Sequence, residues 1–459
     1  MKILFISLGC DKNLVDSENM LGLLREANYE ITNDENEADV IVVNSCCFIH
    51  DAKEESIQTI LEMAQLKETG NLKALIVAGC LAQRYRDEIT KELPEVDAII
   101  GTTGYENIVS IVQEVLNKSK DNSATSDGDK SKNTSGSTPE SFKDINYLPK
   151  VSKRINTTGG YYSYLKIAEG CNKHCTYCII PEIRGEYRSV PMELLLQEAK
   201  ELADNGVKEL ILVAQETTIY GTDLYGERKL PELLHELAKI DGICWIRILY
   251  CYPEEIDIDL INAIKAEPKV LNYLDMPIQH CTDKILKKMG RRTSKQELVD
   301  KVHLLRENIP DITLRTTLIT GFPGETEEDH EELKSFVKAM EFDRLGVFTY
   351  SPEEGTPAAS FEPQIDEEVK VKRQEEIMLI QQKIAFDRAA KQPGRVLPVM
   401  IEGFLPDDQV YIGRTYMDAP NIDGFVFVSS ERTYMSGDIV DVYITDSNEY
   451  DLIGEIIER

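Results

Sequence analysis

Three cysteines stand close together in the segment EGCNKHCTYCIIP, at Cys171, Cys175 and Cys178. This spacing places three thiolates on one loop, where they can hold three iron atoms of a [4Fe–4S] cluster. Such clusters usually take four cysteines, so a three-cysteine loop leaves one iron open to another ligand. A structural zinc site would need a fourth protein ligand, and His174 is the only local candidate. The spacing, and its place after a predicted strand, favour the cluster.

A second set of three cysteines is spread over the first 80 residues. Cys10, Cys46 and Cys80 each follow directly on a short apolar run, in FISLGC, VVNSC and IVAGC. If these runs are neighbouring parallel strands, their carboxyl ends meet at one edge of the sheet and the three thiols converge there. Three buried core cysteines would instead lie within strands or on inward helix faces. The repeated position therefore predicts a second three-cysteine cluster with open coordination.

The other four cysteines do not show this pattern. Cys47 is next to Cys46 but should point in a different direction, so we expect it to be a bystander. Cys244, Cys251 and Cys281 lie in or beside predicted strands, where free cysteine commonly packs as a small hydrophobic residue. Disulfides are not expected in an apparently cytosolic chain. The six histidines form no metal-ligand spacing.

The elements that position Cys10, Cys46 and Cys80 alternate short β-branched runs with helical patterns. The runs are KILFISL, DVIVVNS, ALIVAG and DAII, and the helical patterns lie near residues 16–27, 51–67, 81–93 and 106–116. This order predicts an α/β domain over residues 1–116, with a doubly wound parallel sheet. Residues 117–156 are rich in Ser, Asn, Asp, Lys and Thr, and we expect a flexible linker or insertion there.

A second series of strand candidates positions the other triad. It comprises YYSYLKIA, ELILVAQ, WIRILYC, YLDMPIQ, TLRTTLIT and RLGVFTY, and a long predicted helix over residues 366–391 follows it. Six βα units predict a partial (βα) barrel over residues 157–389, although a second open sheet has the same periodicity. Residues 390–459 change to short alternating runs separated by turn residues, which predicts a small antiparallel β barrel.

The Cys-x3-Cys-x2-Cys segment, with Tyr177 before its last cysteine, resembles the signature of the radical S-adenosylmethionine (SAM) superfamily. The resemblance implies that the open iron binds the amino and carboxylate groups of SAM. It also implies that electron transfer from the reduced cluster cleaves SAM to a 5′-deoxyadenosyl radical, while the barrel orients the reactants and excludes water.

Polar groups at the carboxyl ends of barrel strands are candidates for SAM contacts. Gln215 follows ELILVA and Arg315 lies within TLRTT, and either side chain could instead form a salt bridge or face solvent. The segment GFPGE, from Gly321 to Glu325, lacks the Lys-Ser/Thr of a phosphate-binding loop. It is better interpreted as a barrel loop, where a cofactor contact and simple turn geometry remain equal alternatives.

The three predicted domains in this order look like those of the methylthiotransferases, whose C-terminal barrel is called TRAM. In that family the N-terminal auxiliary cluster carries the sulfur that is methylated and transferred, and two SAM molecules are used, one for the methyl group and one for the radical. The segments GCDKNLVDSE, CCFIHDAKEES, MPIQH, LRTTLITGFPGE and TYSPEEGTPAA resemble the RimO type, which modifies the β-carbon of an aspartate in the twelfth small-subunit ribosomal protein. Chains of the tRNA-modifying MiaB type tend to begin with a GCQMN-like segment. Asp11 stands where the RimO start usually has Pro, which changes the loop after Cys10 but removes no ligand.

The net charge of the chain helps to decide between a ribosomal protein and tRNA as the substrate. The chain of 459 residues has a formal net charge of −30, which repels nucleic-acid phosphates and attracts a basic partner, although acidic residues also aid solubility. From Ala390 onward there are 13 acidic and 5 basic residues, a net of −8, whereas an RNA-binding barrel needs a basic groove. We therefore expect barrel acids to attract a basic ribosomal protein, among them Asp407, Asp408, Asp418 and Asp423.

The sequence thus predicts a cytoplasmic RimO-type transferase with two [4Fe–4S] clusters and SAM, served by an electron donor and a sulfur source. No apolar stretch is long enough to span a membrane, and the first residues lack a signal-peptide cleavage site. The alternatives are a MiaB-type tRNA methylthiotransferase and, from a different class, a non-catalytic iron–sulfur carrier. Cleavage of SAM on reduction separates the enzymes from the carrier.

Overall fold

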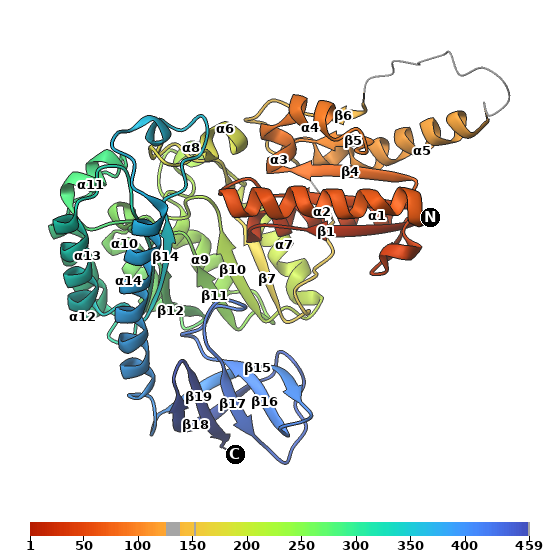
Figure 1. Ribbon diagram of the computed structural model, residues 1–459. Helices are drawn as coiled ribbons and strands as arrows, with labels where there is room; N and C mark the ends of the chain where they lie inside the picture. Colours follow the sequence, from red (N-terminus) through yellow and green to blue (C-terminus); the bar gives the residue numbers. More distant parts are fainter. Residues whose placement is uncertain (125–137, 151–152, 458–459) are drawn as a thin grey trace.

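The computed structural model describes residues 1–124, 138–150 and 153–457. Figure 1 shows an N-terminal sheet domain beside a larger central sheet domain, with a small barrel packed below the central domain. No helix in the described residues is long and apolar enough to cross a membrane.

The N-terminal domain is built on a parallel sheet. Within the described residues its strand order is β2-β1-β3-β4-β5-β6. The strands are β1 (Lys2–Ser7), β2 (Glu30–Thr32), β3 (Val40–Ser45), β4 (Ala74–Gly79), β5 (Ala98–Ile100) and β6 (Glu140–Ser141). The helices are α1 (Asp11–Glu26), α2 (His50–Thr69), α3 (Cys80–Arg84), α4 (Arg86–Glu92) and α5 (Ile108–Ala124), with 3-10 turns η1 (Glu35–Glu37) and η2 (Tyr105–Asn107).

Both faces of this sheet are covered, so its central strands β3 and β4 are buried along their whole length. Alternate residues of β3 face opposite sides: Ile41 and Val43 belong to the apolar cluster that includes α2 and α3, whereas Val40 and Val42 belong to the cluster with α1 and α5. Continuous apolar strands of this kind are typical of parallel sheets buried on both sides. The predicted doubly wound α/β domain is confirmed.

Part of the segment expected to be a linker is folded. Helix α5 continues to Ala124, and β6 pairs with β5 as the sixth strand of the sheet. Asn146, still within the expected linker, accepts a hydrogen bond from the backbone N–H of Glu186 in the central domain at 2.8 Å. The polar composition of the segment did not reveal these pairings, because a two-residue strand adds almost no hydrophobic pattern. The rest of the expected linker at 125–137 and 151–152 lies outside the described residues.

The central domain contains a second parallel sheet, with the order β14-β13-β12-β11-β10-β7 in the described chain. Its strands are β7 (Tyr162–Lys166), β10 (Glu209–Val213), β11 (Trp245–Ile248), β12 (Val270–Asp275), β13 (Thr313–Thr320) and β14 (Arg344–Thr349). The sequential order of an unclosed sheet is that of a partial (βα) barrel, as predicted. A short antiparallel pair, β8 (Ala168–Glu169) and β9 (Arg188–Ser189), brackets the loop that carries Cys171, Cys175 and Cys178.

Helices cover one face of the central sheet. The helices on this face include α7 (Met192–Asp204), α9 (Leu230–Ala238), α10 (Ile258–Ala266), α11 (Asp283–Lys288), α12 (Lys295–Asn308), α13 (Glu327–Met340) and α14 (Glu367–Ala389). The domain also contains the short helices α6 (Ile180–Arg184) and α8 (Thr222–Tyr225) and the turns η3 (Pro253–Glu255) and η4 (Pro357–Ser360). Leu210 and Leu212 of β10 belong to the apolar cluster with the helices on this face. Ile211 and Val213 point the other way and pack with Val15 of α1 and with the C-terminal barrel. Helix α1 therefore covers part of the inner face of the partial barrel.

The C-terminal strands form a closed barrel in the order β15-β16-β17-β19-β18. They are β15 (Val396–Leu405), β16 (Val410–Arg414), β17 (Val426–Ser429), β18 (Ile439–Asn448) and β19 (Asp451–Ile456). Neighbouring strands are antiparallel as predicted, except that β17 and β19 run parallel.

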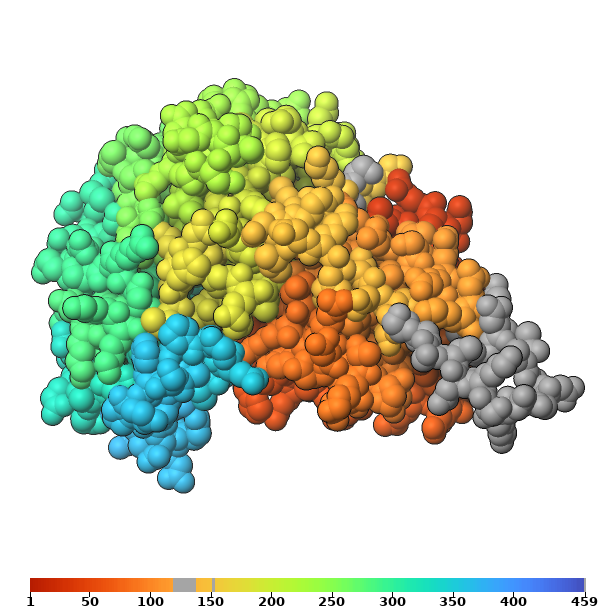
Figure 2. All heavy atoms as spheres, turned by 90° about the horizontal axis from the view of Figure 1, so that it is seen from above, coloured from red at the N-terminus to blue at the C-terminus, as the bar shows by residue number. Residues whose placement is uncertain are grey.

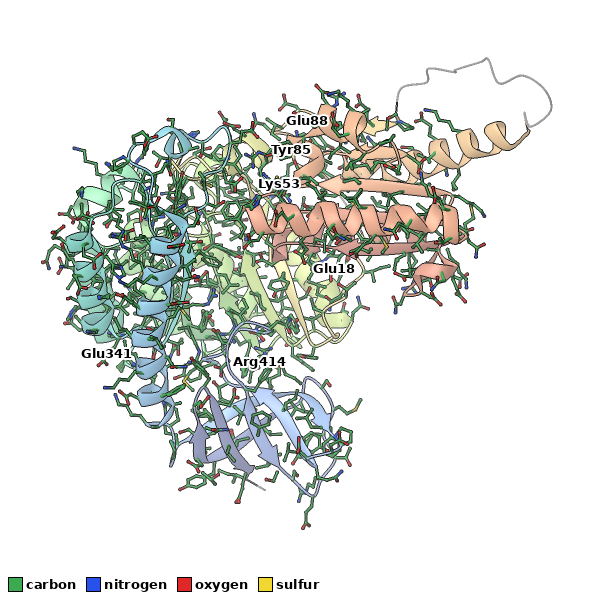
Figure 3. The ribbon with its side chains drawn as sticks, viewed as in Figure 1. Glu18, Lys53, Tyr85, Glu88, Glu341 and Arg414 are labelled. Carbon is green, nitrogen blue, oxygen red and sulfur yellow. The ribbon has the colours of Figure 1, made fainter. Side chains whose placement is uncertain are left out.

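Buried charges anchor this barrel to the central sheet. Glu209 of β10 accepts hydrogen bonds from Arg247 of β11 at 2.8 Å and from Arg414 of β16 at 2.5 Å. Arg247 also donates to the backbone oxygen of Tyr416 at 2.8 Å. Figure 3 shows Arg414 at the junction between the barrel and the sheet above it. All three charged side chains are inaccessible to solvent, so the contact is part of the folded core of the molecule.

Two of the acids expected on the barrel surface belong to this junction instead. Asp418 is 2% exposed and accepts hydrogen bonds from Arg344 and Thr415. The side chain of Asp423 accepts from the Tyr273 hydroxyl at 2.9 Å. The expectation that Asp418 and Asp423 attract a partner is therefore wrong. The barrel surface is still acidic, because seven other acids are exposed: Asp407, Asp408, Glu431, Asp438, Asp446, Glu449 and Glu455.

Candidate active site at the two cysteine triads

The first triad lies at the carboxyl edge of three adjacent strands of the N-terminal sheet. Cys10 is the residue before α1, Cys46 follows β3, and Cys80 is the first residue of α3 directly after β4. Strands β1, β3 and β4 are hydrogen-bonded neighbours, so the three loops emerge side by side. Cys46 and Cys80 are buried and Cys10 is exposed.

Two glycines allow these loops to approach one another. Gly9 and Gly79 precede Cys10 and Cys80, and both have positive φ, +87° and +90°. A Cβ at Gly9 would lie 2.7 Å from Cβ of Cys46, and one at Gly79 would lie 2.2 Å from Oδ1 of Asn44. Only glycine fits both the conformation and the space. The repeated Gly-Cys pairs of the sequence therefore have a structural cause that the sequence analysis did not use.

Asn13 connects all three loops of the first triad. Its amide nitrogen donates to the backbone oxygen of Leu8 at 3.1 Å, before Cys10, and to that of Ser45 at 3.0 Å, before Cys46. Its side-chain oxygen accepts from Sγ of Cys80 at 3.5 Å. Asn13 is completely buried in α1, so one side chain fixes the relative positions of the three cysteine loops.

Burial favours the protonated form of two thiols of the first triad, those of Cys46 and Cys80. Burial raises the pKa of Cys80 far above its ordinary value; Arg184 opposes the shift, and the neighbouring Cys47, Cys46 and Cys10 add to it. Burial is also the main cause of the raised pKa of Cys46, to which Cys10 contributes. A cluster bound by Cys46 and Cys80 must displace the protons of these two thiols.

The second triad lies on the loop between β8 and α6. The loop is held by backbone hydrogen bonds from Cys171 to the oxygen of Gly185 at 3.1 Å and from Thr176 to that of Met289 at 2.9 Å. The N–H of Cys178 donates to the oxygen of Cys175 at 3.0 Å, which closes the turn between these two ligands. Gly170, directly before Cys171, again has a positive φ, +80°, and a Cβ there would lie 2.1 Å from the oxygen of Glu186.

The surroundings of the second triad are also buried and aromatic. Burial, with contributions from Cys175 and Glu216, raises the pKa of Cys171 to about 11. The Tyr252 hydroxyl lies 3.7 Å from Sγ of Cys175. Sequence analysis missed the buried Arg291, whose guanidinium lies 4.2 Å from the ring centre of Tyr252 and leaves Nε and Nη1 without partners.

The short helix α6 joins the two triads. It begins two residues after Cys178, and Ile183 of the helix and the N-cap residue Ile179 pack in the core of the N-terminal domain. At its end, Nη2 of Arg184 lies 3.4 Å from Sγ of Cys80. Figure 2 shows the yellow segment that contains this helix packed against the orange N-terminal domain. The segment that begins at the second triad thus contacts a sulfur of the first triad, that of Cys80.

The donor set fits two cysteine-bound iron–sulfur clusters. In the described residues no three His, Cys, Asp or Glu side chains converge closely enough to hold a single metal ion. A [4Fe–4S] cluster makes a different demand, because each thiolate ligates its own iron. The first triad offers three sulfurs on neighbouring loops and the second offers three on a single loop, and in the described residues no carboxylate or imidazole completes a single-ion site at either one.

The two residues predicted to contact SAM are placed differently. Gln215 donates from Nε2 to Glu169 at 2.8 Å and leaves its buried Oε1 without a partner, so an acceptor near the second triad is free. Arg315 lies 3.5 Å from Asp275 and 3.9 Å from Asp423 of the C-terminal barrel. Two carboxylates thus compensate the charge of Arg315, which favours the salt-bridge alternative. Glu325 of GFPGE accepts from the backbone N–H groups of Gly321 and Phe322, which favours turn geometry.

The remaining cysteines lie in packed surroundings. Cys47, Cys251 and Cys281 are completely buried in apolar clusters, and burial raises the pKa of Cys47 to about 12. Cys244 is partly buried beside the cluster at the barrel junction. Their positions are those of small apolar residues.

The first turn of α1 meets the inner face of the central sheet. Asp11 accepts a hydrogen bond from the Tyr250 hydroxyl at 3.0 Å and forms an ion pair with Lys12 at 2.9 Å. Asp11 thus ties the loop after Cys10 to the central domain, a contact that the usual Pro cannot make.

Comparison with known proteins agrees with this architecture. Residues 2–101 match the model of the uncharacterized protein family UPF0004, residues 165–337 that of the radical SAM superfamily, and residues 394–457 that of the TRAM domain. Ribosomal protein uS12 methylthiotransferase RimO from Lachnoclostridium phytofermentans is 64% identical over 99% of both chains. The protein of the same name from Acetivibrio thermocellus is 52% identical over 100% of this chain and 99% of its own. The chain belongs to the RimO methylthiotransferase family.

Membership in the RimO family confirms the predicted type of radical SAM transferase. A solved structure of the radical SAM methyltransferase TsrM from Kitasatospora setae shares the fold, with a TM-score of 0.54 and 14% sequence identity over 78% of this chain and 76% of that one. At this identity the likeness concerns the fold alone.

Proposed function

We propose that this chain transfers a methylthio group to the β-carbon of an aspartate in ribosomal protein uS12, with one [4Fe–4S] cluster on each cysteine triad. The names of the RimO relatives include ribosomal protein uS12 as the substrate. The observation that carries the proposal is the contact between Arg184, six residues after Cys178, and Sγ of Cys80. It brings the two triads to opposite ends of one short helix, as a transfer between two centres requires.

When bound, the cluster at Cys171, Cys175 and Cys178 supplies a carbon-centred radical from SAM, and the cluster at Cys10, Cys46 and Cys80 supplies the sulfur. The residues of the chain fix the positions of these two groups relative to each other. Asn13 aligns the three loops of the first triad, and α6 fixes the distance from the second. Helix α1 covers part of the inner face of the central sheet, where Val15 packs with Ile211 and Val213.

The electrostatic surface supports a basic partner. The exposed acids of the C-terminal barrel, together with the net charge of −30, attract a basic protein and repel an RNA backbone. The electron donor and the source of the sulfur are further partners of this reaction, in a cytoplasmic protein that works on ribosomes.

The test is a side-by-side reaction of the reconstituted enzyme with uS12 and with tRNA, under reducing conditions with SAM. Mass spectrometry should find one added methylthio group on an aspartate of uS12 and none on tRNA. Replacement of Cys171, Cys175 and Cys178 by Ala should abolish 5′-deoxyadenosine formation. Replacement of Cys10, Cys46 and Cys80 should stop the transfer and leave SAM cleavage measurable.

Each alternative has its own outcome. Methylthiolation of tRNA with no mark on uS12 would assign the chain to the MiaB activity. No SAM cleavage by the reduced, iron-loaded protein would leave only the iron–sulfur carrier. Normal transfer by the Cys10, Cys46 and Cys80 variants would remove the first triad from the reaction.

A further inference from the structure

Arg184 is a buried cation in direct contact with a sulfur of the first triad. It occupies the last position of α6 and is 2% exposed. Its Nη2 atom donates to Sγ of Cys80 at 3.4 Å and also to Oδ1 of Asn13. Its Nη1 atom donates to Asp16 at 2.6 Å and to Glu169 at 3.3 Å. The guanidinium therefore has its orientation set by three groups other than the sulfur.

Arg184 belongs to a buried group of ion pairs beside Cys80. Asp16 and Glu169 are the two carboxylates of the group, and Lys166 binds both of them, at 2.5 and 2.7 Å. Two cations and two anions give a net charge of zero. When Cys80 ligates iron as a thiolate, an additional negative charge lies beside the guanidinium in a site that solvent does not screen.

We propose that Arg184 is a positioning residue that orients the Cys80 thiolate and raises the reduction potential of the cluster on the first triad. This inference rests on the function proposed above, since it requires that cluster. A fixed positive charge and a hydrogen bond to a ligand sulfur both stabilise the more negative, reduced state of an iron–sulfur cluster. The reduced state is thereby reached at a less negative potential than the protein would otherwise allow.

A guanidinium is suited to this place and an ammonium is not. Arg184 directs separate N–H groups to Asp16, Asn13 and Cys80 in one plane, whereas lysine presents a single point charge on a flexible stem. Arg184→Lys should therefore keep the charge near the carboxylates and lose the contact with sulfur. Arg184→Gln should lose both.

The experiment is a redox titration followed by electron paramagnetic resonance on the full, iron-reconstituted chain. The Cys171→Ala, Cys175→Ala and Cys178→Ala background isolates the signal of the first triad. We expect Arg184→Gln to reduce the reduced-to-oxidised ratio at a fixed potential at least tenfold, a negative shift of about 59 mV for one electron. Arg184→Lys should shift the potential less. The matched control is Arg188→Gln, since Arg188 donates to backbone oxygens of Arg184 and Glu186 and touches no cysteine.

The outcomes separate this inference from the proposed function. A background protein that binds no iron at Cys10, Cys46 and Cys80 would overturn the proposed function and the inference with it. A background protein that binds about four irons, with the same potential in Arg184→Gln as in Arg188→Gln, would overturn the inference alone. If both Arg184 variants fold with an unchanged melting temperature but bind no iron, the residue serves assembly and its role in the potential is refuted. Iron retention by Arg184→Lys with a shifted potential supports the inference even where Arg184→Gln is unstable.

Discussion

The junction between the C-terminal barrel and the central sheet should depend on a single buried carboxylate. Glu209→Gln removes the negative charge that Arg247 and Arg414 share and replaces one acceptor oxygen by an amide that donates. Arg247 is fully buried and then has no charged partner among the described residues, although it keeps the backbone oxygen of Tyr416 and the ring of Tyr273. Breaking a buried ion pair by removal of one partner costs about 3–5 kcal/mol. We expect a loss of this size in the free energy that holds the barrel in place.

The chain provides its own probe of this junction. Trp245 is its single tryptophan, it lies directly opposite Glu209 in the β10–β11 register, and it packs with Met400 and Ala419 of the barrel region. In cluster-free protein, the fluorescence of Trp245 should shift to the red at a lower denaturant concentration in Glu209→Gln than in the parent. Glu455→Gln, which changes an exposed acid of the same barrel, is the control.

Acid should have the same effect as the substitution. Burial by itself would raise the pKa of Glu209, but Arg414 and Arg247 more than offset it and hold the pKa below its ordinary value. A carboxylate with a lowered pKa in the folded state contributes stability above its unfolded pKa of about 4.3, and this contribution is lost as the pH falls through the lower, folded value. The junction of the parent should therefore weaken in acid, whereas that of Glu209→Gln should depend less on pH. Coincident transitions of Glu209→Gln and Glu455→Gln at neutral pH would refute this reasoning.

Three further predictions follow from the site and the surface. Gly79→Ala should lose the iron of the first triad and lower the free energy of unfolding by at least about 2 kcal/mol. The reason is that Gly79 has a positive φ and that a Cβ there would lie 2.2 Å from Oδ1 of Asn44. Normal iron content in a colorimetric assay would contradict this prediction. Lysine in place of exposed barrel acids such as Asp407 should slow association with uS12 and make the association rate less dependent on salt, as measured by stopped flow. Unfolding curves should stay as in the parent. An unchanged association rate would exclude the barrel as the docking surface. Cys46→Ala should lose about half of the bound iron, and Cys47→Ala should keep all of it, so the opposite result would exchange the two in the ligand set.

Much of the site followed from the sequence because its determinants are local. A thiol directly after each of three apolar runs must lie at one edge of a parallel sheet, and β1, β3 and β4 place Cys10, Cys46 and Cys80 there. The second triad could be predicted from the spacing of Cys171, Cys175 and Cys178 alone. Strand periodicity and turn residues likewise predicted the three-domain order, since a run of alternating or continuous apolar residues has few other ways to be buried.

Tertiary structure alone decided which polar side chains meet. Arg184 reaches Cys80 across 104 residues, and Arg414 reaches Glu209 across 205. Asp418 reads as a surface acid in the sequence, yet docking of the barrel buries it against Arg344. The physical reason is that the position of a charged residue in the sequence follows no repeating pattern that would reveal its burial. Whether it faces water or a buried partner depends on how whole domains pack, and that packing is set by apolar faces elsewhere in the chain.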